Sequence, residues 1–384
     1  MVARGVDCTD TNFLDDKFCT LRKVYGAPPY LVNHLDLTSM ANAPVSAGDP
    51  FGYVIESQGA HNVVYRATDA SVRELRRSNS GIVQSDLSTR AGAPRALGDP
   101  KAFVTPTVGI ENVLYRAADG HLHNVRRSAG RIVDENLTAP SHAPGPAGDP
   151  ATYVAFTDGL QHAVYRGVDG HLHELFWLNG PAGHGDLTQE SRTPGPVGNP
   201  AAYFLSGDGT QHVFFHGANG TLHELWWTNG PIGHGDLTVQ SSAPPPDGSP
   251  AAYFAPTYGL QNVVYRGTDK RLHGLFWTTG RVGHDDLSRT VAAPLPASDP
   301  SAYFVTAEGT HYVIYRGTDN HLHELSWTTA AVTHHDLTVL ASSPSVPIPL
   351  AVGNPSAYFV PADRTYHAIY RTSDGHLHDL QSHR

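Results

Sequence analysis

The chain has 384 residues, with 38 glycines, 29 prolines and a formal net charge of −10 at pH 7. Basic residues occur only in short pairs such as Arg76-Arg77 and Arg126-Arg127, so nucleic acid is not an expected partner. No stretch approaches the roughly 18 apolar residues of a membrane span, so no membrane insertion is expected. The N-terminus has no apolar signal-peptide core, which predicts cytoplasmic residence or export without a signal peptide.

Residues 1–32 are expected to form an irregular leader before a single domain at 33–384. The leader holds the only two cysteines, Cys8 and Cys19. They could pair and staple the leader or stay reduced, and the sequence leaves both states open.

A repeat of about 50 residues then dominates the chain and overrides the length-based expectation of two or three domains. Its marker is a Tyr-Arg pair after two or three β-branched or apolar residues. The tyrosines of this marker are Tyr65, Tyr115, Tyr165, Tyr265, Tyr315 and Tyr370, and Phe215 holds the remaining place. The last copy arrives five residues late, after a proline-rich insertion that belongs in a loop between repeats.

Each repeat predicts four short strands bounded by turn-forming residues. In one copy the first strand is expected at 250–255, after a turn of the Gly-Asp-Pro type, and the second at 261–266. The third is expected at 272–277 and the fourth, containing an Asp-Leu pair, at 283–288. No segment has the apolar stripe of a helix of ten or more residues.

The order of the strands predicts how the ring closes. The first Asp-Leu pair, Asp36-Leu37, precedes any complete repeat, and the chain ends near Leu380 with a third strand that has no fourth. Placing residues 33–38 beside that last strand completes a blade and leaves no unpaired edge. The sequence therefore predicts an all-β, seven-bladed β-propeller with an N-terminal outer strand. Its blades are expected at about 48–88, 98–138, 148–188, 198–238, 248–288, 298–338, and 353–384 plus 33–38.

The segment from Tyr165 to Trp177, Tyr-Arg-Gly-Val-Asp-Gly-His-Leu-His-Glu-Leu-Phe-Trp, resembles the repeat of the Photorhabdus-type (PLL-like) seven-bladed propeller lectins. The resemblance extends over about residues 33–384. It implies non-catalytic binding of fucose-like or O-methylated sugars in clefts between adjacent blades. The chain departs from that pattern in having only five tryptophans and as many as 24 histidines.

Three repeated side-chain types are candidates for ligand binding. The flat face of a tryptophan can cover the C–H face of a sugar, while nearby polar groups bind the hydroxyls. The same tryptophans could instead pack between blades, and the histidines could form structural hydrogen bonds between blades. The arginines could anchor hairpins whose turns are capped by the aspartate three residues later. The candidate residues are Trp177, Trp227, Trp277, Trp327, His184, His234, His284, His334, Arg166, Arg266 and Arg316.

Metal and catalytic sites have weaker signals. Pairs such as His321/His323 and His376/His378 share a strand face, but no third ligand accompanies them at a fixed spacing, so no metal or cofactor is predicted. No phosphate-binding loop, serine elbow or His-Glu-x-x-His motif occurs.

The sequence thus favours a multivalent carbohydrate-binding protein, a lectin, whose partners are glycans or glycoconjugates. Two alternatives stay open: a protein-interaction scaffold with no small ligand, and a propeller hydrolase or lyase with an axial pocket. The oligomeric state is also open.

Overall fold

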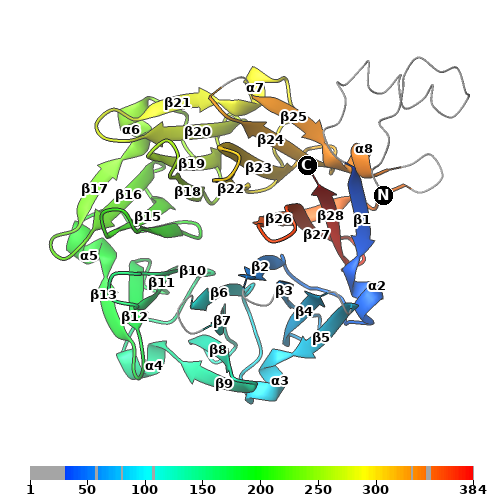
Figure 1. Cartoon of the computed structure of the whole chain (residues 1–384). Helices are drawn as coiled ribbons and strands as arrows, with labels where there is room; N and C mark the ends of the chain where they lie inside the picture. Colours follow the sequence, from blue (N-terminus) through cyan, green and yellow to red (C-terminus); the bar gives the residue numbers. More distant parts are fainter. Residues whose placement is uncertain are drawn as a thin grey trace, which may run out of the picture.

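The computed structural model describes residues 31–56, 59–78, 81–105, 109–329, 332–342 and 347–383. Seven four-stranded antiparallel sheets stand around a common centre, and their first strands lie nearest that centre (Figure 1). The predicted seven-bladed propeller is confirmed. The predicted leader and its cysteines fall almost entirely outside the described residues.

Blades 1 to 6 each consist of four consecutive strands. The first strands are β2 (Phe51–Ile55), β6 (Lys101–Thr105), β10 (Ala151–Val154), β14 (Ala201–Leu205), β18 (Ala251–Ala255) and β22 (Ser301–Val305). The second strands are β3 (Ala60–Arg66), β7 (Ile110–Arg116), β11 (Gln161–Arg166), β15 (Thr210–His216), β19 (Leu260–Arg266) and β23 (Thr310–Arg316). The third strands are β4 (Val72–Ser78), β8 (Leu122–Ser128), β12 (Leu172–Trp177), β16 (Leu222–Trp227), β20 (Leu272–Trp277) and β24 (Leu322–Trp327). The fourth strands are β5 (Gly81–Asp86), β9 (Arg131–Asn136), β13 (Gly183–Asp186), β17 (Gly233–Asp236), β21 (Gly283–Asp286) and β25 (Thr333–Asp336).

Blade 7 joins the two ends of the described chain. Its own strands are β26 (Ala351–Val360), β27 (Thr365–Thr372) and β28 (Leu377–His383), and its fourth is β1 (Val32–Asp36). Strand β1 pairs antiparallel with β28, with Val32 opposite Ser382 and Asp36 opposite His378. Figure 1 shows this pairing as a blue arrow beside a dark red one. The predicted closure by an N-terminal outer strand is confirmed.

A short helix follows each fourth strand. These helices are α2 (Leu37–Ala41), α3 (Leu87–Ala91), α4 (Thr138–Ser141), α5 (Leu187–Ser191), α6 (Leu237–Ser241), α7 (Leu287–Thr290) and α8 (Leu337–Ala341). No helix in the described part of the chain has the length and apolarity needed to cross a membrane.

The Asp-Leu pair was expected to lie within the fourth strand. This is right for the aspartate but wrong for the leucine, which belongs to the short helix that follows. Strand β21 ends at Asp286, and Leu287 begins helix α7. The Asp286 side chain accepts a hydrogen bond from the backbone N–H of Arg289, which is the N-cap arrangement that satisfies a free helical donor. The buried leucine that follows packs into the interface between blades.

The core of the described residues consists of apolar clusters at the interfaces between neighbouring blades, one at each interface and a second, smaller one between blades 6 and 7. The cluster between blades 3 and 4, for example, contains Tyr153 and Leu172 from one blade and Phe215 and Leu225 from the next. Both faces of every sheet are therefore covered, which is why each second strand is an almost continuous apolar run.

A circle of side-chain-to-backbone hydrogen bonds links the turns that precede the first strands. The backbone N–H of Asp49 donates to Asp99, that of Asp99 to Asp149, and that of Asp149 to Asn199, at 2.9, 3.1 and 2.9 Å. The remaining members of the circle are Ser249, Asp299 and Asn354, and the backbone N–H of Asn354 returns to Asp49. Each blade thus holds the next one near the axis.

The repeated tyrosine anchors the segment that leads into its own blade. The Tyr165 hydroxyl donates to the backbone carbonyl oxygen of Pro144 at 2.8 Å, and its side chain is fully buried. The same bond, 21 residues apart, recurs for Tyr65, Tyr115, Tyr265, Tyr315 and Tyr370.

We expect Tyr165→Phe to lower the free energy of unfolding by about 1–2 kcal/mol, because the Pro144 carbonyl loses its donor. Phe215, which fills this position in blade 4, gives the matched change: Phe215→Tyr should cost less than Tyr165→Phe. Urea unfolding of both variants measures the difference. An unchanged midpoint for Tyr165→Phe would show that the hydroxyl contributes nothing.

Candidate functional site

Each blade has two ends that differ in chemistry. At the turn end, the turn between the second and third strands lies near the short helix. At the loop end, the loops join the first to the second strand and the third to the fourth. Arg166 is opposite Leu172 at the turn end of blade 3, whereas Gln161 is opposite Trp177 at the loop end. Five residues of strand separate the two ends, a distance of roughly 16 Å.

The predicted site residues are therefore not brought together in one place. The four tryptophans lie at the loop end, and the three arginines lie at the turn end. The histidines of the fourth strands lie between them, since His184 is opposite Leu175. Because of this separation, one small ligand cannot contact the tryptophan and the arginine of the same blade. Their roles in ligand binding stay predictions.

The tryptophans pack between blades. Trp177 is only 4% exposed and contacts the ring of Phe103 from blade 2 edge-on, with 6.5 Å between ring centroids. Trp277 is 7% exposed and contacts Phe214 of blade 4 in the same way. Trp227 and Trp327 are partly buried against the preceding blade.

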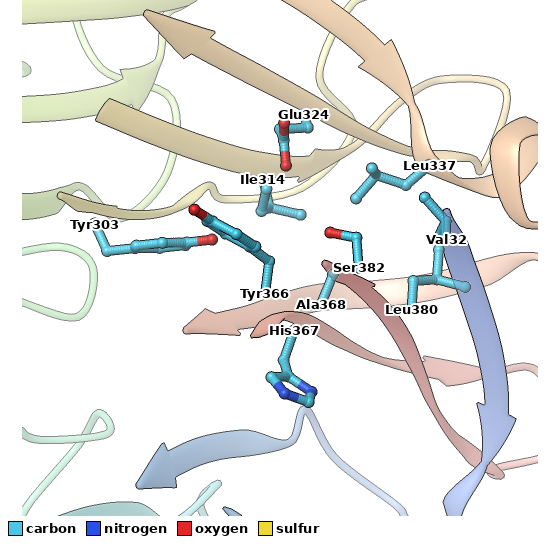
Figure 2. A pocket seen from close by; sticks show the side chains of 10 residues that line it. All are labelled: Val32, Tyr303, Ile314, Glu324, Leu337, Tyr366, His367, Ala368, Leu380 and Ser382. Carbon is cyan, nitrogen blue, oxygen red and sulfur yellow. The ribbon is translucent and has the colours of Figure 1, made fainter. Parts of the chain in front are cut away.

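Cavities lie at two interfaces where the tryptophan is replaced. One lies between blades 6 and 7, where Ser382 takes the tryptophan position, and its free volume is about 10 Å³, the size of one water molecule. Figure 2 shows Tyr303, Tyr366, Glu324 and Ser382 around it. The other lies between blades 7 and 1, beside Arg77.

In blades 3 and 4 the residue before the tryptophan is an exposed aromatic that the sequence pattern did not single out. Phe176 is 36% exposed and Trp226 is 38% exposed. Each ring lies over a glycine of the fourth strand. A Cβ atom added to Gly233 would come within 2.3 Å of the Trp226 ring, and one added to Gly183 would come within 2.3 Å of the Phe176 ring. The glycines at 183, 233 and 283 were the available sequence signal, because they leave room for a ring directly across the strand pair.

These exposed rings face the next blade. Strand alternation places Phe176 on the same face as Glu174, whose carboxylate accepts a hydrogen bond from Tyr153 at 2.9 Å. The Tyr153 hydroxyl also lies 2.6 Å from Oε1 of Gln211 in blade 4. Phe176 and Trp227 therefore lie on facing sides of the interface between blades 3 and 4.

The interface between blades 4 and 5 repeats this arrangement, with a tryptophan in the place of Phe176. Trp226 of blade 4 and Trp277 of blade 5 flank it, and between them lie Glu224 and Gln261. With its amide oriented to satisfy both ends, Gln261 donates to Glu224 at 3.2 Å and accepts from the Trp277 indole N–H at 3.2 Å. Burial raises the pKa of Glu224, against the opposing hydrogen bond from His212.

Buried histidines complete both polar clusters. His162 Nδ1 lies 2.8 Å from Glu174 Oε1, and His212 Nδ1 lies 2.9 Å from Glu224 Oε1. The outer nitrogens, Nε2 of His162 and of His212, have no hydrogen-bond partner although both are buried. Each of these two interfaces thus combines a partly exposed aromatic ring with a buried, unsatisfied histidine nitrogen.

The turn end holds chains of hydrogen-bonded side chains within each blade. In blade 3, Asp169 accepts from His173 Nε2 at 3.0 Å, and His173 Nδ1 lies 3.0 Å from His184 Nε2. His223–His234, His273–His284 and His323–His334 repeat the histidine pair at 2.9, 2.9 and 3.0 Å. These histidines do form structural hydrogen bonds, but the expectation that the bonds run between blades is wrong for them, because each pair joins the third and fourth strands of one blade.

The arginines anchor backbone segments. Arg166 donates to the Ala147 carbonyl at 2.9 Å. Arg316 donates both to the Ala297 carbonyl at 2.6 Å and to the Gly353 carbonyl of blade 7 at 3.1 Å. Arg266 pairs with Asp247 at 3.3 Å. The predicted turn-capping aspartate is confirmed, since Asp169 accepts from the His171 backbone N–H at 3.1 Å.

The chain matches no protein-family model and no curated protein. Solved structures do resemble it. The BP39L lectin from Burkholderia pseudomallei aligns with a TM-score of 0.67 at 15% identity, over 88% of this chain and 96% of that chain. This chain shares its fold with that lectin. AofleA from Arthrobotrys oligospora (13% identity, 80% and 90% covered) and the fucose-specific lectin from Aleuria aurantia (12% identity, 76% and 96% covered) each give a TM-score of 0.50.

We expect Trp177→Ala to lower the free energy of unfolding by about 3–5 kcal/mol, because it empties a large buried position between blades. Trp226→Ser should change it by less than about 1 kcal/mol, because that ring is already partly in solvent and blade 6 carries Ser326 at this position. Denaturant unfolding of the two variants tests the contrast. Equal losses would contradict the assignment of one ring to packing and the other to the surface.

Acid should destabilise the protein partly through His311. Burial lowers its pKa to about 4, and its Nδ1 accepts from the Tyr253 hydroxyl at 2.9 Å. Between pH 6.5 and 4 the unfolded chain binds a proton that the folded chain excludes, so stability falls as the pH falls through this range.

The repeat supplies the matched variant, His311→Gln, since Gln161, Gln211 and Gln261 fill this position in blades 3 to 5. We expect the variant to lose less stability than the parent between pH 6.5 and 4, by on the order of 2 kcal/mol. Unfolding free energies measured from pH 4 to 8 give the two curves. Parallel curves would show that His311 binds its proton equally in both states.

Proposed function

We propose that the protein is a multivalent lectin that binds sugars in the clefts at the loop ends of blades 3 to 6. The observation that carries this proposal is the pair of exposed aromatic rings, Phe176 and Trp226, each at an inter-blade interface that also holds buried, unsatisfied polar groups. A flat ring beside hydrogen-bonding groups suits the apolar C–H face and the hydroxyls of a pyranose.

The cleft between blades 4 and 5 is the best-formed of these sites. Trp226 offers the exposed ring, and Trp277 forms the opposite wall. Glu224 and the unpaired Nε2 of His212 supply an acceptor and a ring nitrogen for sugar hydroxyls. The clefts on either side, with Phe176 and Trp227 or with Phe276 and Trp327, are the related sites.

Two further points support carbohydrate as the ligand class. The fold is shared with the BP39L lectin and with a fucose-specific lectin, and the repeat resembles the Photorhabdus-type propeller lectins. Fucose-like and O-methylated sugars are therefore the first candidates. Several weak sites on one rigid ring would raise the avidity for a multivalent glycan without any new contact.

A glycan array probed with the labelled full-length chain tests the proposal. Selective binding to one glycan family, with methyl α-fucoside as competitor, is the expected result. A blank array from folded protein would overturn the lectin assignment and favour a protein partner.

We expect Trp226→Ser to remove one sugar site, lowering the number of bound monosaccharides by one or weakening that site about tenfold, the equivalent of about 1.4 kcal/mol. Val239→Ser is the matched control, because Val239 is an exposed apolar side chain of the same blade, in helix α6, remote from the cleft. Titration calorimetry measures both. Unchanged binding by Trp226→Ser would exclude this cleft even if the protein binds glycans elsewhere.

A further inference from the structure

The seam where the first and last described strands meet brings together three metal-ligating side chains. Asp36 ends strand β1, His376 directly precedes β28, and His378 lies in β28. One potential ligand atom from each lies within 4.8 Å of the others. Residues some 340 positions apart in the sequence therefore supply the third ligand that the sequence pattern could not reveal.

A buried nitrogen without a partner points into this cluster. His378 is 3% exposed, and its Nε2 forms no hydrogen bond. The equivalent Nε2 atoms of His123, His173, His273 and His323 each bond to the aspartate of the preceding turn. In blade 7 that aspartate, Asp374, instead accepts from the hydroxyl of Thr372.

Blade 4 shows where this nitrogen points. There Thr221 replaces the first histidine, and its hydroxyl lies 3.0 Å from His223 Nε2 and 2.8 Å from Asp236 Oδ2. The equivalent atoms of blade 7 are His378 Nε2 and Asp36 Oδ2. A single atom between His378 Nε2 and Asp36 Oδ2 could therefore contact both, as the Thr221 hydroxyl oxygen does in blade 4. In blade 7 the imidazole of His376 lies beside this space.

The surrounding bonds hold the three ligands in place. His378 Nδ1 lies 2.9 Å from His34 Nε2, so with Nε2 as the ligand atom its Nδ1–H donates to His34. Such a bond from the second ring nitrogen is the usual support of a metal-bound histidine. Asp36 Oδ1 accepts from the Ser39 backbone N–H at 2.9 Å. The side chains of Asp36 and His376 are 29% and 30% exposed, which leaves a path from solvent.

We propose that Asp36, His376 and His378 bind one divalent transition-metal ion across the seam of the ring. Two imidazoles and one carboxylate suit zinc and its neighbours better than calcium or magnesium, which prefer oxygen ligands. A water molecule completes a tetrahedral site. Because Asp36 belongs to the closing strand β1, whereas His376 directly precedes β28 and His378 lies in it, the ion binds only the closed ring and stabilises it.

A second group in the described residues, Asp319, His321 and Asp336, has a similar spacing of ligand atoms. There, however, both carboxylate oxygens of Asp319 lie within hydrogen-bond distance of His323 Nε2, at 3.1 and 3.2 Å. The seam differs in having a free nitrogen, and this difference makes it the preferred site.

The test uses zinc ion alone with the full-length chain. The seam variant is Asp36→Asn with His376→Thr. Each substitution introduces the residue that another blade carries at the same repeat position. Asn136 takes the place of the aspartate before helix α4 and accepts from the Ala139 backbone N–H at 2.9 Å, and Thr221 replaces the histidine in blade 4. The variant therefore keeps side chains that the fold already accommodates. The matched control makes the same changes in blade 3, Asp186→Asn with His171→Thr.

Titration calorimetry should show that the seam variant loses one zinc site or binds it at least tenfold more weakly, while the blade 3 control keeps it. Zinc should also raise the melting temperature of the parent and of the control more than that of the seam variant. Cobalt should give a tetrahedral visible spectrum with the parent that the seam variant lacks. Equal zinc binding by parent and seam variant, or equal loss in the blade 3 control, would overturn the proposal.

Discussion

The pairing of β1 with β28 is the constraint on which the rest of the molecule depends. Without it, β28 would present an unpaired edge, and the cluster that contains Val32 and Leu380 would lose one side. Each interface between blades is built from the two facing sheets, so an open ring would expose the interfaces at its ends. The pairing ties the two ends of the described chain into one blade. The inner circle of hydrogen bonds closes separately near the axis, from Asn354 of blade 7 to Asp49 of blade 1.

The histidines follow from the same architecture. A propeller strand is covered on both faces, so a polar side chain in it needs a partner within the sheet or in the next blade. Histidine meets this need because one ring nitrogen donates while the other accepts. His173 uses both nitrogens in this way, bonding Asp169 and His184, and His311 stays neutral between Tyr253 and the parallel ring of Trp327. The high histidine content therefore requires no catalytic role.

The repeat made the number of blades and the mode of closure predictable, because a register of 50 residues places each strand without reference to its contacts. The site was less predictable. In a half-buried sheet, alternation separates inward from outward side chains, but both faces of a propeller strand meet a neighbouring blade. Trp226 and Trp227 are adjacent in the sequence and each faces a neighbouring blade, so the sequence does not show which of them is exposed. In the structure Trp226 is exposed and Trp227 is partly buried.

Other features depended on contacts between distant residues. The polar side chains of the turns before the first strands form a circle of hydrogen bonds only because the seven turns meet near the axis. The Asp-Leu pair could not be recognised as a helix cap, because helices of four or five residues are too short to show a helical apolar period. The third ligand of the seam cluster comes from the opposite end of the chain, where no local spacing rule applies.

Differences between the blades suggest a division of the ring. At the position of the tryptophan, blades 1 and 2 carry Arg77 and Arg127, and Arg127 bonds to the buried carboxylates of Glu74 and Glu111 at 2.6 and 2.9 Å. Arg127 thus forms ion pairs with a carboxylate of its own blade and with one of blade 1, so at this interface the arginine pairs with both buried carboxylates. Blades 3 to 6 carry a tryptophan at this position instead. Blades 3 and 4 also carry the exposed rings of Phe176 and Trp226 together with the unsatisfied Nε2 atoms of His162 and His212. Under the proposed function, this difference in how the interfaces are filled sets the number of sugar sites on the ring.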